Sequence, residues 1–195
     1  YLSLKYDYEY IQEYFVKRPW EKLFQDIGIQ HILDLYKSKG LIDLYPIYIK
    51  KFNILFDAKG LSTNITMKEF YDYSGIDLFI YTVNVNTFCA ECFSLKTHPN
   101  WRVLDVIYIS CSIPMIFEPF RHPETRNFYV DGGFCINYPI VPCIKHVLEE
   151  GDKLNSILGI NLNLKDGCNE LLYENINESI SLFEYFYIIL NKMIW

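Results

Sequence analysis

Residues 110–139 read SCSIPMIFEPFRHPETRNFYVDGGFCINYP, and this stretch is the most informative part of the chain. The run NFYV at 127–130 predicts a short β-strand, because β-branched and aromatic residues favour strands. The strand leads into Asp131, and the two glycines that follow let the chain turn and let another backbone approach closely. A carboxylate at the carboxyl end of a strand in an open α/β sheet faces the crevice where ligands bind. Asp131 is therefore a candidate general base.

The tripeptide at 131–133 has an ordinary structural explanation as well. Asp-Gly is a strong signal for a tight turn between two antiparallel strands. A short motif of this kind does not distinguish a catalytic carboxylate from a surface hairpin. The residues at 131–133 alone leave both alternatives open.

Helical and strand patterns alternate along the rest of the chain. Apolar spacing and capping signals predict helices at 7–17, 20–27, 31–39, 46–57, 67–73, 102–111, 140–149 and 178–195. Alternating, β-branched or aromatic runs predict strands at 76–85, 91–95, 127–130 and 154–164, with 86–90 as the turn between the first two. Strands separated by helical patterns are typical of the α/β class. We therefore expect a three-layer αβα sandwich around a mostly parallel central sheet.

Composition excludes several classes of protein. The chain has 195 residues, of which 51% are hydrophobic and 22% charged, so it is neither disordered nor of low complexity. No apolar run approaches the roughly 18 residues of a membrane span. The formal net charge of −6 would repel a phosphate backbone, so nucleic acid is not an expected partner. No Pro-, Gly- or Ser-rich linker divides the chain, and we expect one domain over 1–195, with 165–195 as a C-terminal helical extension.

The cysteines and histidines give weaker signals. Cys89 and Cys92 have CxxC spacing, but a zinc site needs two further ligands, and no second CxxC or paired histidine is present in the sequence. An incidental pair in a hairpin is the simpler interpretation, and a metal or redox role is the alternative. We predict no metal and no other cofactor.

Three blocks, in this order, resemble the patatin-like phospholipase family. They are Gly75-Ile76-Asp77-Leu78-Phe79-Ile80; then Ser110-Cys111-Ser112-Ile113-Pro114 with Phe117 and Pro119; then Asp131-Gly132-Gly133 with Asn137, Tyr138 and Pro139 behind. The resemblance extends from about residue 8 to about residue 164. Three blocks in a compatible order are much more specific than any one of them.

The resemblance implies a serine acyl hydrolase that acts on lipids through a Ser–Asp dyad without histidine. Asp131 stands at the position of the family's catalytic aspartate, and Gly132 and Gly133 form the supporting turn. No metal and no cofactor are implied. The implied partner is a phospholipid or other lipid ester, with a lipid interface as a further partner and a cytoplasmic or peripheral-membrane location as the default. The apolar face expected on helix 178–195 suits either such an interface or a core contact.

The sequence departs from the family pattern at the nucleophile. No G-x-S-x-G and no Gly-rich oxyanion motif occur; Ser62 follows Gly60-Leu61, but Asn64 stands where the second glycine belongs. We therefore expect a chain truncated at the N-terminus, with the nucleophile and the oxyanion loop upstream of Tyr1, and inactive by itself. A non-catalytic lipid-binding or interaction remnant of the same fold is the alternative. A third interpretation is an unrelated α/β domain with a fortuitous DGG turn.

Overall fold

The computed structural model describes residues 2–17, 39–43 and 45–160. It divides the chain into two compact units, Tyr1–Gly132 and Gly133–Trp195, which are described separately. The first unit contains the helices η1 (Leu2–Leu4), α1 (Tyr8–Val16), α3 (Tyr45–Asp57), α4 (Met67–Ser74) and α5 (Val103–Ile109). Its strands are β1 (Gly40–Ile42), β2 (Ile80–Asn84), β3 (Cys89–Phe93), β4 (Met115–Phe117), β5 (Phe120–Arg121) and β6 (Phe128–Asp131).

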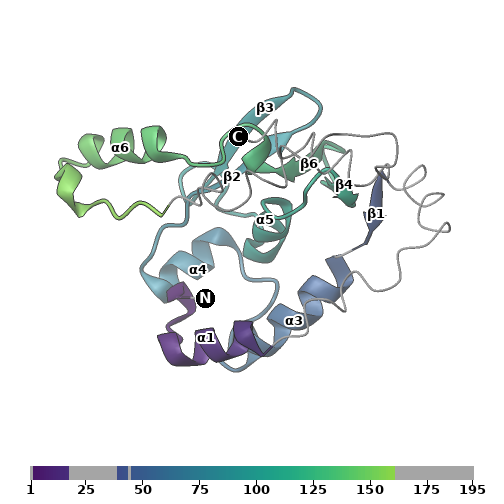
Figure 1. The fold of residues 1–195 in the computed structure, drawn as a ribbon, viewed down its shortest axis with the longest axis horizontal. Coiled ribbons are helices and arrows are strands. Elements are labelled where there is room, and N and C mark those ends of the chain that lie inside the picture. Colours follow the sequence, from purple (N-terminus) through teal and green to yellow (C-terminus); the bar gives the residue numbers. More distant parts are fainter. Residues whose placement is uncertain (1, 18–38, 44, 161–195) are drawn as a thin grey trace, which may run out of the picture. The chain divides into compact units, whose positions relative to one another are not determined.

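The main sheet of the first unit has four strands in the order β3-β2-β6-β5 (Figure 1). Every neighbouring pair in this sheet is antiparallel. A second, two-stranded sheet pairs β1 with β4 in parallel. The mixture of helices and strands agrees with the sequence analysis, but the expected mostly parallel central sheet is wrong for the described residues.

Short connections explain two of the three antiparallel pairs in the main sheet. Residues 85–88 join β2 to β3, and residues 122–127 join β5 to β6. Such short loops return the chain beside the strand it has just left, whereas a parallel pair needs a crossover of about a dozen residues or more. The parallel pair β1 and β4 has such a long crossover, because residues 43–114 lie between the two strands.

Local signals place the helices of the first unit correctly. The predictions at 7–17, 46–57, 67–73 and 102–111 correspond to α1, α3, α4 and α5, with shifts of one or two residues at the ends. Helix α4 begins at the predicted capping box, in which the Thr66 side chain accepts a hydrogen bond from Glu69 N and the Glu69 carboxylate accepts one from Thr66 N. It ends at Gly75, whose φ of 73° lies in the left-handed region.

The capping box gives a first testable prediction. Replacing Thr66 with alanine removes the side-chain oxygen that satisfies Glu69 N, and we expect the free energy of unfolding to fall by about 1 kcal/mol. Urea denaturation followed by circular dichroism measures this change. Thr87→Ala is the matched control, because Thr87 is exposed in the turn between β2 and β3 and caps no helix. Equal losses in the two variants would contradict the capping role.

Helix α5 forms the centre of the first unit's core, and it contacts β2, β5 and β6 (Figure 1). Val103, Leu104 and Ile109 of α5 are fully buried, as is Phe93 of β3. Tyr129 of β6 belongs to the same cluster. Burial of these side chains fixes one face of the sheet against α5, and that face carries the side chains opposite and beside Asp131.

The second unit begins at Gly133 and contains α6 (Ile140–Glu149) and η4 (Leu154–Ser156). Helix α6 agrees with the prediction at 140–149. The strand expected at 154–164 is wrong over 154–160, where η4 replaces its start and no strand follows. Ser156 explains this, because its backbone N and its hydroxyl both donate to the Lys153 carbonyl and close a local turn.

Residues 161–195 and 18–38 lie outside the described part of the chain. The helices predicted at 20–27 and 178–195, the extension at 165–195 and almost all of the helix predicted at 31–39 fall there. Within the described residues, no helix combines the length and the apolar character needed to cross a bilayer.

Candidate active site

Asp131 is the last residue of β6, and β6 is an inner strand between β2 and β5. The next residues form the 3₁₀ helix η3 (Gly132–Phe134) rather than a tight turn into a returning strand. Both partners of β6 precede it in the sequence. The surface-hairpin alternative for the Asp-Gly pair is therefore wrong, and Asp131 stands at the carboxyl end of an inner strand.

Gly132 allows the backbone to leave β6 tightly against β2. A Cβ atom added to Gly132 would overlap the Tyr81 carbonyl and would lie 2.9 Å from Thr82 N. Gly132 itself is buried. The close backbone approach expected from the sequence is present, and only glycine is accommodated directly after Asp131.

The segment after α5 lies beside the end of β6. Asp131 N donates a hydrogen bond of 3.0 Å to the Ser112 carbonyl, so the second and third sequence blocks are in contact. The Ser112 side chain is 1% exposed, and its hydroxyl donates to the Tyr108 carbonyl at 2.8 Å. The Ser110 hydroxyl likewise donates to the Ile107 carbonyl at 3.0 Å. Both hydroxyl protons are engaged by the backbone, so neither serine is presented as a nucleophile.

Cys111 lies between these serines and responds to the charge of Asp131. The residue keeps solvent exposure. Partial burial of the thiol is the larger cause that raises its pKa, and the negative charge of Asp131 raises it further. A thiol with a raised pKa stays protonated at neutral pH, and the protonated form is a poor nucleophile. Cys111 is thus a neutral neighbour of Asp131 rather than an activated thiolate.

This proximity gives a second prediction. In Asp131→Asn the negative charge is lost, the pKa of the Cys111 thiol falls, and the thiolate fraction at about pH 7.5 rises. We expect alkylation of Cys111 by iodoacetamide to become about threefold faster, measured by mass spectrometry of the digested protein. Alkylation of the exposed Cys143 in the same samples is the control. An unchanged ratio of the two rates would show that the charge of Asp131 does not act on this thiol.

Thr82 is a neighbour of Asp131 that sequence reasoning missed. It lies directly opposite Asp131 in the register of β2 and β6. The residue is 0% exposed, and its Oγ1 atom has no hydrogen-bond partner among the described residues. A threonine in a strand is an ordinary β-forming residue, so the sequence contained no signal for this position.

A cluster of three polar side chains, separate from Asp131, links α3 to α5. The Tyr45 hydroxyl donates to Asp105 Oδ1 at 2.6 Å, and Arg102 Nη1 lies 3.5 Å from the same oxygen. Burial raises the pKa of the Asp105 carboxyl, and the contacts with Tyr45 and Arg102 oppose that rise. Burial and the hydrogen bond to Asp105 raise the pKa of Tyr45 to about 12. These contacts link the three side chains and tie α3 to α5, while Arg102 Nε has no hydrogen-bond partner among the described residues.

The CxxC pair does not form a chelating site. Cys89 and Cys92 are both on β3, three positions apart, so their side chains project to opposite faces of the sheet. No group of His, Cys, Asp or Glu suited to a metal ion is present within the described residues. Within the described residues, the two thiols of this CxxC therefore do not converge on one metal ion or on each other.

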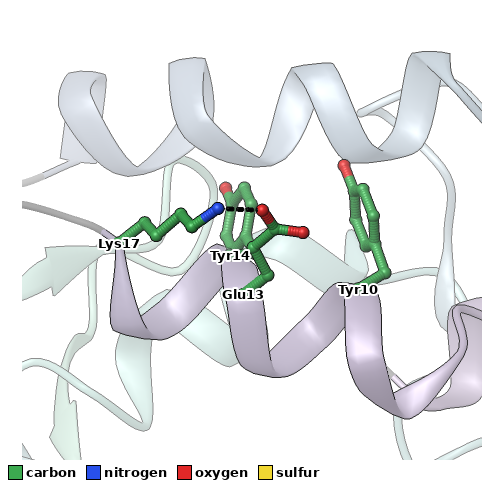
Figure 2. A pocket seen from close by; sticks show the side chains of 4 residues that line it. All are labelled: Tyr10, Glu13, Tyr14 and Lys17. Carbon is green, nitrogen blue, oxygen red and sulfur yellow. Dashed lines mark hydrogen bonds and ion pairs between the residues drawn. The ribbon is translucent and has the colours of Figure 1, made fainter.

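Figure 2 shows a hollow of about 250 Å³ that is remote in sequence from the three blocks. Its lining residues Tyr10, Glu13 and Tyr14 belong to α1, and Lys17 directly follows that helix. The Glu13 carboxylate pairs with the Lys17 ammonium group (Figure 2). No residue of the three sequence blocks lines this hollow.

A known protein family matches most of this chain. The sequence model of the patatin-like phospholipase family matches residues 2–144. The chain belongs to the patatin-like phospholipase family. The match includes all three sequence blocks, and membership confirms the α/β class of the fold.

One relative is a viral member with an assigned name. The protein "Probable lipid hydrolase 463L" of Invertebrate iridescent virus 6 is 34% identical over 88 residues. The aligned part covers 45% of this chain and 30% of the relative. This chain therefore spans less than a third of the length of the curated relative that it matches.

Proposed function

We propose that this chain is part of a lipid acyl hydrolase in which Asp131 is the general base of a Ser–Asp dyad. The proposal rests mainly on the position of Asp131 in the main sheet. It ends an inner strand and is bonded through its backbone to the Ser112 segment, in a chain of the patatin-like phospholipase family. The Asp131 carboxylate thus stands at one end of the sheet beside the segment that follows α5, and a carboxylate there can take up the proton of a serine hydroxyl.

In the proposed reaction, the Asp131 carboxylate accepts the proton of a serine hydroxyl. The serine oxygen then attacks the ester carbonyl carbon, the bond to the alcohol breaks, and Asp131 returns its proton to the departing alkoxide. Asp131 then takes a proton from water, and the water oxygen attacks the acyl carbon. The bond to the serine oxygen breaks, Asp131 returns the proton to that oxygen, and the fatty acid leaves. The bonds formed and broken balance without a cofactor.

The surroundings of two of the four histidines, His98 and His122, favour a dyad over a triad. His98 stacks on Phe93 with ring centroids 4.0 Å apart, and burial lowers its pKa. His122 stacks on Trp101 at 4.4 Å, and its Nδ1 accepts a hydrogen bond from Thr125 N. These two imidazoles are held in aromatic packing, which supports a mechanism that relies on Asp131.

The proposed nucleophile lies outside the 195 residues. No G-x-S-x-G is present in the sequence, and the hydroxyls of Ser110 and Ser112 donate to backbone carbonyls. The oxyanion donors are proposed to come from the same outside segment, since no Gly-rich run is present either. The described residues then supply the base and the turn that supports it.

The proposed substrate is a lipid ester, in line with the family description and the name of the viral relative. The test is to incubate the full-length gene product with phosphatidylcholine vesicles and to measure free fatty acid by mass spectrometry. Release of fatty acid above that of a heat-inactivated sample supports the proposal. Binding to the vesicles without release would favour the alternative of a non-catalytic lipid-binding protein.

A further inference from the structure

A row of three polar side chains crosses the main sheet at Asp131. In the register of the strands, Thr82 of β2 lies opposite Glu91 of β3 on one side and opposite Asp131 of β6 on the other. Residues directly opposite in antiparallel strands project to the same face, with Cβ atoms about 5 Å apart. The Thr82 hydroxyl is therefore flanked by two carboxylates.

The Thr82 hydroxyl is fully buried and needs an acceptor. Its Oγ1 atom makes no hydrogen bond within the described part of the chain, and the residue is 0% exposed. A buried hydroxyl without a partner is costly, and the few that native proteins keep call for an explanation. Valine would fill the same volume without this cost, so the hydroxyl itself is the feature to explain.

Glu91, the carboxylate on the other side of Thr82, already accepts a hydrogen bond. Asn84 Nδ2 donates to Glu91 Oε1 at 2.8 Å, and Glu91 also faces the Tyr129 hydroxyl. Burial raises the pKa of Tyr129, and the Glu91 carboxylate raises it further. Glu91 thus has donors of its own on the same face of the sheet. A hydroxyl has a single hydrogen to donate, and a carboxylate accepts several hydrogen bonds. The Thr82 hydroxyl can therefore donate to Asp131, its direct neighbour on β6, without displacing the donors of Glu91.

We propose that Thr82 is a positioning residue whose hydroxyl donates to the Asp131 carboxylate and orients it as the base. A rotation about the Cα–Cβ bond of Thr82 or one bridging water completes the bond. The inference rests on the proposed function for its catalytic meaning, but the hydrogen bond can be measured independently. Cys111 and Glu91 are the other titratable groups that face Asp131 from the segment after α5 and from across the sheet.

The test is a carbon-13 NMR titration of the Asp131 carboxyl in the full-length protein, with Asp131→Asn used to assign the signal. Losing a donor to the ionised form raises the pKa of a carboxyl. We expect the pKa of Asp131 to rise by about one unit in Thr82→Val and to stay within about 0.3 units in Thr82→Ser. If Thr82→Val does not fold, Thr82→Ala also removes the hydroxyl and takes its place.

Two results would overturn the inference: an unchanged pKa of Asp131 in the variants without a hydroxyl, or a shift in Thr82→Ser as large as in Thr82→Val. The acid limb of kcat/KM provides the catalytic readout, and it should move to higher pH by the same amount as the carboxyl. A protein that hydrolyses no ester but shows the carboxyl shift would refute the proposed function and keep the Thr82 contact. Hydrolysis that depends on Asp131, together with an unchanged pKa of Asp131 in Thr82→Val, would keep the proposed function and refute the Thr82 contact.

Discussion

Replacing Asp131 with asparagine should lower kcat for lipid ester hydrolysis by the full-length protein by about a thousandfold. Asparagine has the shape of aspartate, but its amide cannot accept the proton of the attacking serine. The strand position of Asp131 and its backbone hydrogen bond to Ser112 do not depend on the side-chain charge, so the fold is expected to persist. Initial rates with a p-nitrophenyl ester, at saturating substrate, measure the effect.

Asp72→Asn is the matched control for this experiment. Asp72 is exposed on α4, and its carboxylate pairs with Lys68 at 3.4 Å. Exposed pairs of this kind contribute little to stability, and we expect activity within twofold of the wild type. Activity of Asp131→Asn as high as that of Asp72→Asn would remove Asp131 from the mechanism.

Gly132→Ala should lower the free energy of unfolding by about 3 kcal/mol. The new methyl group would overlap the Tyr81 carbonyl, and backbone in a paired strand cannot move aside as a flexible side chain can. Relief of the overlap would require β6 to shift away from β2 at the position of Asp131. Urea denaturation monitored by circular dichroism gives the change.

Gly60→Ala separates this overlap from the general effect of replacing glycine. Gly60 has a φ of 68°, and a Cβ added there meets no atom within 4 Å. An alanine in the left-handed region costs about 1 kcal/mol. A loss for Gly132→Ala no greater than that for Gly60→Ala would mean that the contact with Tyr81 is not tight in solution.

Local chemistry accounts for the elements that sequence reasoning predicted correctly. The side chains of Thr66 and Glu69 and the glycine at 75 set both ends of α4 through hydrogen bonds and backbone conformation within a few residues. The strand at 127–130 and its end at Asp131 were likewise predictable, because strand-forming residues meet a glycine pair. Such features need no knowledge of distant parts of the chain.

Long-range pairing explains the errors. Sequence alternation indicates that a strand exists but not which strand lies beside it, so the antiparallel sheet was predicted as mostly parallel. The strands β1 and β4 were missed for the same reason. Three residues at 40–42 form a strand only because residues 115–117 lie beside them. Thr82 was missed for the same reason, since its position opposite Asp131 depends on the register of β2 and β6.

The candidate site was predictable through its motif but not through its geometry. The Ser110–Pro114 block and the Asp131 turn were identified as parts of one family pattern, and the hydrogen bond from Asp131 N to the Ser112 carbonyl shows that they are in contact. The motif did not indicate that the hydroxyls of Ser110 and Ser112 are occupied by backbone carbonyls. Only the coordinates exclude these two serines as nucleophiles.

Covalent labelling of the full-length protein with a fluorophosphonate tests the central claim most directly, because the reagent reports both the identity and the activation of a nucleophilic serine. The account predicts a label on one serine in a G-x-S-x-G segment outside the 195 residues. It also predicts a labelling rate that falls by about a hundredfold or more in Asp131→Asn. Labelling of a serine within the 195 residues, or an equal rate in Asp131→Asn, would contradict the proposed dyad.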